Sequence, residues 1–345
     1  MQAVEALENG IEWSPVGQTG GMIGRMKALF FCWKLARRAI NTKQTVLLHA
    51  RSYIPAMVAN LACRGSTVPW LFDMRGFWVD EKVLKGNLSS GSIAHRILKR
   101  IERRLLRNCS AIVSLTRKAL PRLREISGLP ELPAYAVIPT CVDLEHFTHW
   151  IKAPVSGDEI TFGYVGSLGA GYSNDDVTQF LVHALAALPR SRAVILSRSS
   201  PEVLGPMLHR LSRFGSRVEC MSATYEEMPQ KLSEMDVGLS FITPHASKDA
   251  SAPTKIAEYL ACGVLVISNK GIGDIDEILE EGNVGFSINC PEEFEEAVSA
   301  ALAAVSEESI RDRCRAYAVE HFSVCEGAQR YADLYRQIID PKLKL

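Results

Sequence analysis

Short apolar runs alternate with longer segments of helical periodicity through most of the chain. Short runs rich in Val, Ile and Leu are typical of buried strands, and apolar residues three and four positions apart are typical of helices. The predicted strands are 45–50, 68–76, 110–116, 135–140, 160–169, 193–197, 217–221, 236–244, 264–268 and 284–288. The predicted helices are 25–40, 53–63, 93–109, 118–127, 176–188, 201–214, 225–235, 254–262 and the segments after Pro291, ending with 327–339. This alternation predicts a doubly wound α/β fold.

The 345 residues exceed what one hydrophobic core usually covers, so the length predicts two domains. Between Asp143 and Asp158 the pattern becomes irregular, with several charges around Pro154. We place the boundary there, which separates residues 1–150 from residues 151–325.

The composition is that of an ordinary soluble globular protein, with 47% apolar and 23% charged residues. The longest apolar run, ALFFCW around Phe30, is far shorter than the ~20 residues that span a bilayer. The N-terminus has acids where a signal peptide would be apolar. The nine cysteines form no C-x-x-C pair, which argues for a reducing cytosol and against disulfides or a structural zinc.

The formal net charge is +0, yet the charges are divided unevenly between the two halves. Residues 1–150 carry 21 Lys and Arg against 11 Asp and Glu, and residues 93–109 are the most basic segment. An amphipathic helix there would bind the anionic inner face of the cytoplasmic membrane through its basic side chains. These are Arg96, Lys99, Arg100, Arg103, Arg104 and Arg107, around the apolar stripe Ile93, Ile97, Ile101 and Leu105. A solvated face on a core helix is an equal alternative. Nucleic acid is disfavoured because no aromatic residues are interleaved.

The stretch from Ser251 to Asp274 contains the strongest functional signal. A loop of small residues leads into an apolar helix, Gly263 ends that helix, and a buried strand follows. With the preceding strand, this segment forms a βαβ unit. Helix N-termini at the carboxyl ends of parallel strands bind anions, and Thr254 and Lys255 stand at that place. The pattern predicts a phosphate site.

Two glycines, Gly166 and Gly169, follow the apolar strand that opens the second half. Without Cβ atoms at these positions, a phosphate could approach the backbone closely. A plain turn between a strand and a helix explains the same pattern equally well.

Motifs spread over most of the chain resemble the retaining GT-B glycosyltransferases that use nucleotide-sugar donors, a family with many bacterial polysaccharide and lipopolysaccharide transferases. The motifs are HARSYIPA, WLFDMRGFWVDEKV, VIPTCVDLEHF, FGYVGSL, DVGLSF, SAPTKIAEYLACG, GIGD and HFSVCEGAQRYADLY, in that order. The resemblance implies two Rossmann-like domains that face each other across a cleft. It also implies that the last segment, residues 326–345, is a helix crossing back to the first domain.

The resemblance assigns most of the donor site to the second domain. Glu258 would bind the donor ribose, for which a carboxylate is suited because it accepts two hydrogen bonds from a diol. Lys255 and the backbone of Ser251, Pro253 and Thr254 would hold the diphosphate. Gly166 and Ser167 would line the cleft near the phosphates. A solvated acid at 258 and a solvated lysine at 255 are the plain alternatives.

The chain departs from the family pattern at several positions. The family often has a glutamate eight positions before Glu258, where Ala250 stands, so the neighbouring Asp249 would act on the sugar from a loop. Ser167 stands where a basic residue is usual, so phosphate charge would fall on Lys255 and Arg198.

In the first domain, Asp73 and Arg75 follow a buried strand and would position the acceptor or the sugar. A structural Asp–Arg pair is the alternative. The usual first strand and its glycine-rich loop have no counterpart, since the glycines of 17–24 follow no strand. We therefore expect a first domain that is truncated at its N-terminus.

The resemblance implies sugar transfer from a nucleoside diphosphate to a hydroxyl of a cell-surface glycan or lipid-linked saccharide, with retention at the anomeric carbon. No metal or cofactor is expected, because backbone amides and Lys255 would carry the diphosphate charge. The D-x-D at Asp274 to Asp276 resembles a metal site, but its place at the start of a helix predicts N-capping. A catalytically inactive nucleotide-sugar-binding or scaffolding relative and a sugar-nucleotide epimerase are the alternatives.

Overall fold

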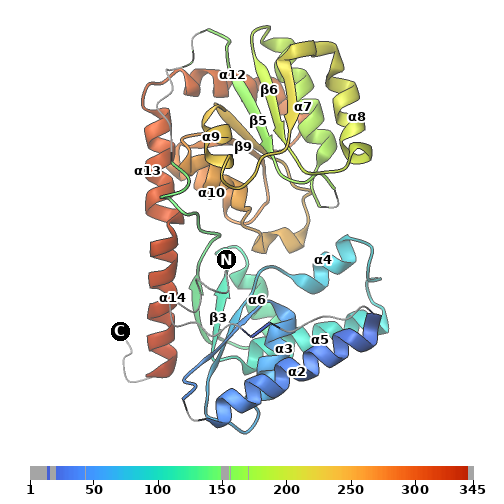
Figure 1. Ribbon diagram of the computed structural model, residues 1–345, viewed down its shortest axis with the longest axis vertical. Coiled ribbons are helices and arrows are strands. Elements are labelled where there is room, and N and C mark those ends of the chain that lie inside the picture. The colour runs from blue at the N-terminus through green and yellow to red at the C-terminus, as the bar shows by residue number, and fades with distance from the viewer. Residues whose placement is uncertain are drawn as a thin grey trace.

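The computed structural model of the chain describes residues 14–15, 21–42, 44–148, 155, 157–169 and 171–340. The chain forms two α/β domains, each built on one parallel sheet, and the second domain lies above the first in Figure 1. The first sheet has the order β1-β2-β3-β4 and the second the order β10-β9-β8-β5-β6-β7. The first sheet consists of β1 (Leu48–Arg51), β2 (Trp70–Asp73), β3 (Ala111–Ser114) and β4 (Ala134–Val137). The second consists of β5 (Thr161–Val165), β6 (Arg192–Leu196), β7 (Val218–Met221), β8 (Val237–Ser240), β9 (Leu265–Asn269) and β10 (Gly285–Ile288). This confirms the predicted α/β fold.

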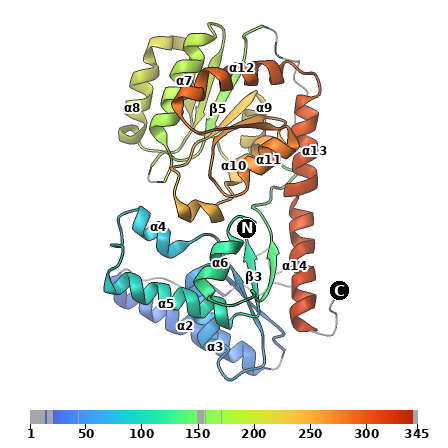
Figure 2. The same cartoon turned by 180° about the vertical axis from the view of Figure 1, so that it is seen from behind.

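The helices of the first domain are α2 (Gly21–Asn41), α3 (Tyr53–Ala62), α4 (Trp78–Leu84), α5 (Ile93–Asn108) and α6 (Leu120–Ser127). Helices α2 and α3 lie at the end of the molecule away from the second domain, whereas α4 lies next to the second domain (Figures 1 and 2). Side chains of α3, α5 and α6 pack on one face of the sheet around Phe72 and Ile112. Helix α4 was not predicted, because seven residues are too few to show a helical period.

The helices of the second domain enclose its larger sheet on both faces. They are α7 (Asn174–Ala187), α8 (Pro201–Leu211), α9 (Met228–Ser233), α10 (Thr254–Ala261), α11 (Ile275–Gly282), α12 (Phe294–Val305) and α13 (Ile310–Phe322). Three 3₁₀ segments are η1 (Ser212–Arg217), η2 (Ala246–Ala250) and η3 (Pro291–Glu293). The predicted helix at 225–235 is shorter than expected, since α9 begins only at Met228.

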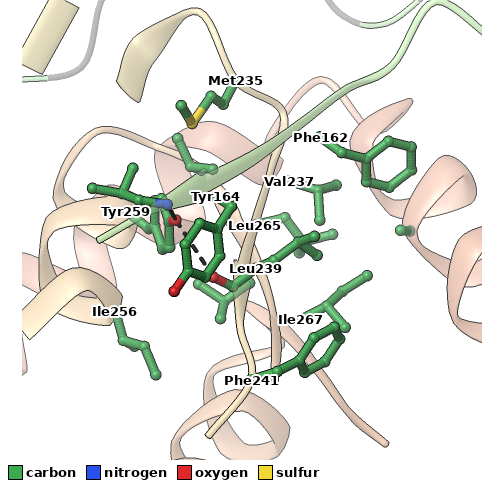
Figure 3. Packing of buried hydrophobic residues seen from close by; sticks show 14 of the residues in the cluster. Phe162, Tyr164, Met235, Val237, Leu239, Phe241, Ile256, Tyr259, Leu265 and Ile267 are labelled. Carbon is green, nitrogen blue, oxygen red and sulfur yellow. Dashed lines mark hydrogen bonds between the residues drawn. The ribbon is translucent and has the colours of Figure 1, made fainter. Parts of the chain in front are cut away.

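Helix α10 packs very closely on its own sheet. A Cβ atom at Gly238 would lie 2.6 Å from the ring of Tyr259, so only glycine fits beneath that ring. The Tyr259 hydroxyl accepts a hydrogen bond from the Val165 N–H at 2.9 Å. Figure 3 shows Tyr259 with Tyr164 in this buried cluster. The packing fixes the start of α10 relative to the end of β5, which is where the predicted site lies.

Helix α14 (Val324–Ile339) follows α13 along one side of the molecule and reaches the first sheet (Figures 1 and 2). Its Leu334 is buried on the sheet face opposite to α3 and α5, together with Leu71 and Val113. The predicted boundary at residue 150 and the predicted glycine loop at 17–20 lie outside the described residues, whereas Gly21 and Gly24 belong to α2.

The basic helix α5 does not bury its predicted apolar stripe completely. Leu105 is buried, but Ile93 is 77% and Ile97 48% exposed. The side chain of Lys99 is turned inward, where its Nζ atom lies 2.7 Å from Asp80 and 2.8 Å from the buried Glu102. Lys99 therefore offers no free charge, in contrast to the exposed arginines of this helix. Within the described part of the chain, no helix is long and apolar enough to cross a membrane.

Candidate functional site

The start of α10 lies against the loop that follows β5. Gly166 has a φ of +130°, a value that L side chains rarely adopt. A Cβ atom there would stand 3.2 Å from the Nζ atom of Lys255. The structure thus brings together two residues that the sequence placed at the phosphate site.

Lys255 is an unusual lysine because it is only 7% exposed and its Nζ atom has no hydrogen-bond partner in the structure. The Nζ atom lies 4.3 Å from the ring centroid of Tyr164 and 4.8 Å from that of Tyr172. Burial lowers the pKa of Lys255 to about 7, and the negative charge of Glu258 acts in the opposite direction. An ammonium group in this position would gain strongly from a nearby anion.

Glu258 lies one turn further along α10, at a pocket of about 260 Å³. Burial raises its pKa, and Lys255 partly opposes that shift. The pocket is lined by Phe147, Val165, Gly166, Ser167, Leu196, Ser197, Arg198, Ala223, Tyr225, Met228 and Glu258. Four predicted substrate-binding residues therefore meet around one opening: Gly166, Ser167, Arg198 and Glu258.

The walls of this pocket are held by their own contacts. The Arg198 guanidinium donates to the backbone oxygen of Ala223 at 2.6 Å. The Tyr225 ring stacks on His146 with a centroid distance of 4.1 Å and an interplanar angle of 12°. The Tyr225 ring lines this pocket, and a flat aromatic surface is suited to stacking on a planar ring such as a nucleobase.

The remaining donor-side residues lie at the start of α10. Thr254 is exposed in the first turn, and Pro253 at the N-cap makes no side-chain capping bond. The first-turn amides of a helix lack intrahelical partners and attract anions. Ser251 and Pro253 border a second cavity of about 410 Å³ between the domains, on the other side of α10 from Glu258.

Asp73, predicted to be catalytic, is 2% exposed at the end of β2. Its Oδ2 atom lies 3.4 Å from Nε2 of His49, and Arg75 lies 3.8 Å from its Oδ1 atom. The other ring nitrogen of His49 is 2.6 Å from the hydroxyl of Tyr335 on α14. This geometry agrees with the structural alternative named for the Asp73–Arg75 pair, since the carboxylate joins the sheet to α14.

Asp249 lies on η2 and lines a different opening from Glu258. This opening is a groove of about 860 Å³ between α5 and α6. The groove is lined by Asp80, Ser90, His95, Lys99, Arg100, Arg103, Lys118, Pro121, Arg122, Glu125, Ile126 and Asp249. Seven of the predicted site residues are therefore divided among three openings, whereas Asp73, Arg75, Thr254 and Lys255 line none of these three. Of the residues around the Glu258 pocket, Gly166 lies directly against Lys255.

Asp274 stands at the N-cap of α11, as its position predicted, but its side chain makes no capping hydrogen bond there, so the expected capping role was wrong. Its carboxylate instead accepts the backbone N–H groups of Arg117 and Lys118, at 2.6 and 2.9 Å, in the first domain. A side chain that can reach an unpaired backbone amide in another domain need not turn back to its own helix. Nearby, the Thr140 hydroxyl donates to the backbone oxygen of Ala252 at 2.8 Å. These contacts attach the start of α11 and the loop before α10 to the first domain.

Sequence analysis missed both tyrosines that face Lys255. Tyr164 belongs to the FGYVG strand and Tyr172 to the following loop. Lys255 stands 91 and 83 positions further along the chain, and nothing in this spacing indicates that both rings meet it. Among the described residues, no group of three or more His, Cys, Asp and Glu side chains could hold a metal ion.

Two family profiles match the chain. The glycosyl transferase 4-like domain matches residues 3–141, and the glycosyl transferases group 1 domain matches residues 159–304. No curated protein sequence matches significantly.

Solved structures share the fold at low sequence identity. A glycosyltransferase from Rickettsia africae has a TM-score of 0.73 and 15% identity, over 98% of this chain and 88% of its own. HepE from Anabaena in complex with UDP has a TM-score of 0.70 and 16% identity, over 96% and 87%. Sucrose-phosphate synthase from Thermosynechococcus elongatus has a TM-score of 0.68 and 18% identity, over 95% and 82%.

Together the two profiles cover most of the chain, and the fold agrees over nearly its whole length. The protein belongs to the GT4, or group 1, family of glycosyltransferases and has the GT-B fold. It is a transferase of the EC 2.4 class.

Proposed function

We propose that this glycosyltransferase moves a hexosyl group from a nucleoside diphosphate sugar to a hydroxyl of a cell-surface glycan or lipid-linked saccharide, with retention at the anomeric carbon. The observation that carries the proposal is the Lys255 ammonium group. It is buried without a hydrogen-bond partner, at the start of α10 and against Gly166. A diphosphate supplies the anion that this position lacks.

The donor would lie across Gly166 with its phosphates on the first turn of α10. Lys255 and the free amides of that turn would stabilise the negative charge that develops on the leaving diphosphate. Glu258 would accept hydrogen bonds from the ribose hydroxyls, and Tyr225 would stack on the base. HepE, which has a similar fold, has been solved with UDP-glucose, and this supports a donor of the same class.

The acceptor would approach from the first domain. The groove between α5 and α6 opens beside Asp249 and carries Arg100 and Arg103 on its wall. Retention needs no protein nucleophile in this proposal, since the leaving phosphate takes the acceptor proton on the same face of the sugar. The protein contributes orientation and electrostatic stabilisation.

We also propose that the enzyme works in the cytoplasm at the inner face of the cytoplasmic membrane. The first domain bears the exposed arginines of α5 and, on α2 at the end remote from the second sheet (Figure 1), exposed apolar side chains. The apolar side chains are Ile23, Met26 and Phe30. Basic and apolar side chains together favour binding to an anionic lipid surface.

The test is a pair of variants, Lys255→Ala and Glu258→Ala. Each should reduce sugar transfer at least ~100-fold, because each removes a charged contact to the donor in a shielded site. Lys231→Ala, which removes a partly exposed helical lysine, is the matched control and should keep the wild-type rate. Wild-type rates in both site variants would refute the site.

A thermal-shift screen with UDP, GDP and ADP and their sugars identifies the donor, because a ligand that binds only the folded chain raises its Tm. Saturable nucleotide binding without turnover on any acceptor would instead indicate the inactive, nucleotide-sugar-binding relative. Conversion of the donor sugar without an acceptor would indicate the epimerase.

A further inference from the structure

Three separate elements surround the Lys255 ammonium group. Lys255 lies on α10, Tyr164 on β5, and Tyr172 on the segment between β5 and α7. The Nζ atom lies over both aromatic rings, at 4.3 and 4.8 Å from their centroids, with Gly166 on a further side. A cation over the face of a tyrosine is attracted by the negative face of the ring, and the attraction grows when water is excluded.

The two tyrosines are held differently. Tyr164 is completely buried, and its hydroxyl donates to the backbone oxygen of Ser167 at 3.2 Å. Tyr172 is partly exposed and is fixed mainly through its backbone. Its N–H donates to Gly169 at 3.1 Å, and it forms an isolated antiparallel bridge with Ile242. The Tyr172 side chain can therefore be changed without removing the bonds that hold its backbone.

The charged and titratable groups that act on Lys255 are few. Glu258, on the same helix, is the one carboxylate whose charge acts on it within the part of the chain that the structure describes. Tyr164 and Tyr172 face it from β5 and from the following segment, and neither makes a hydrogen bond to it. The two rings thus favour the charged form of Lys255 together with Glu258.

We propose that Tyr172 is a positioning residue that acts through Lys255. Together with Tyr164 its ring favours the charged form of the side chain and holds the Nζ atom beside Gly166 before a donor binds, so the two rings set the pH range in which the donor diphosphate is bound. This inference rests on the proposed donor site. It requires the aromatic ring of Tyr172 and does not require its hydroxyl.

A consequence is that donor binding takes up a proton at alkaline pH. Burial holds the pKa of Lys255 at about 7, so the side chain is mostly neutral at pH 8 before binding. A diphosphate beside the nitrogen favours the ammonium form and raises that pKa. Binding at pH 8 should therefore take up close to one proton per donor, and binding at pH 6 close to none, by the linkage of charge and binding. Calorimetry in buffers of different ionisation enthalpy measures this number.

The test compares Tyr172→Leu, which removes the ring, with the matched control Tyr172→Phe, which keeps it. Dissociation constants are measured for whichever of UDP, GDP and ADP binds most tightly, from pH 6 to pH 9. Tyr172→Leu should move the midpoint of the pH profile down by roughly half a pH unit, the effect expected for one lost cation–π contact. Tyr172→Phe should keep the wild-type midpoint.

The outcomes of these measurements, together with one NMR titration, separate this inference from a structural role and from the proposed function. A purely structural loss would weaken binding equally at every pH and leave the midpoint in place, which would overturn the inference. So would a Tyr172→Phe variant that behaves like Tyr172→Leu. Should the wild-type chain bind none of the nucleotides, the proposed function fails. In that case the pH titration of the Lys255 ¹³Cε NMR signal, which is identified by its loss in Lys255→Met, still tests the inference. It shows whether Tyr172→Leu lowers the pH midpoint of the Lys255 titration.

Discussion

The Nζ atom of Lys255 lies 3.2 Å from the point where a Cβ atom of Gly166 would stand. The contact joins the loop after β5 to the first turn of α10, two segments about ninety positions apart in sequence. A side chain at 166 would both strain a backbone with a φ of +130° and push the ammonium group aside.

Gly166→Ala should therefore weaken nucleotide binding about tenfold or more, since ~1.4 kcal/mol of lost interaction corresponds to a factor of ten. Gly171→Ala is the matched control, because Gly171 has a φ of +101° but nothing within 4 Å of its added Cβ atom. Both variants share the backbone strain, so an equal loss of nucleotide affinity in the two would show that contact with Lys255 is irrelevant.

Lys255 should make the stability of the folded chain depend on pH in an unusual direction. Its folded-state pKa is about 7, below the ordinary 10.5, so between these values the unfolded chain holds a proton that the folded chain lacks. Stability therefore rises with pH in this window.

Lys255→Met removes that effect, so the variant should be more stable than the wild type at pH 7. The difference should shrink by about 2 kcal/mol between pH 7 and pH 9. Urea unfolding of both proteins at several pH values measures it, and a stability difference that does not change with pH would disprove a buried, perturbed lysine.

Asp274 connects the two domains by accepting the amides of Arg117 and Lys118. Asp274→Ala leaves both N–H groups without this partner, which should cost about 1–3 kcal/mol of unfolding free energy. Faster hydrogen exchange at those two amides is the direct readout. Glu277→Ala, an exposed position on the same helix, should change neither quantity. Unchanged protection in Asp274→Ala would contradict a connecting role.

Membrane binding through α5 should depend on the arginines that the fold leaves exposed. Reversing the charge at Arg96, Arg100 and Arg104 should reduce partitioning onto vesicles containing phosphatidylglycerol at least ~100-fold, because each nearby charge contributes about 1 kcal/mol. Binding to the same vesicles should also fall with added salt.

The control for this experiment is the same reversal on the second domain, at Arg190, Arg210 and Arg213. These residues are exposed but lie away from α5. Equal losses from both triple variants would indicate a response to net charge alone, and no loss from either would exclude electrostatic membrane binding.

The sequence was sufficient to predict the family and the order of the strands and helices. Apolar runs of strand length between helical segments predicted both sheets. This was possible because the pattern of buried residues in a strand or helix can be seen in a few consecutive positions. The place of Lys255 and Glu258 on one short helix after a loop of small residues was predicted for the same reason.

What the sequence left open depends on packing between distant segments. Asp73 lies beside His49, whose other ring nitrogen contacts Tyr335, more than two hundred residues further along the chain. Lys99 belongs to the basic series in sequence, yet a buried Glu102 and its neighbour Asp80 turn it inward. Charge alone could not predict either orientation, because a side chain's direction is fixed by partners from other elements.

The sequence by itself determined two parallel sheets, a helix that begins at Thr254, and the residue types that can bind a diphosphate. Only the tertiary structure decided that Lys255 is buried between two aromatic rings and that Asp274 reaches the other domain. The physical reason is that local patterns encode which side of each element is buried, whereas the charge state and contacts of a buried polar group depend on its whole surroundings.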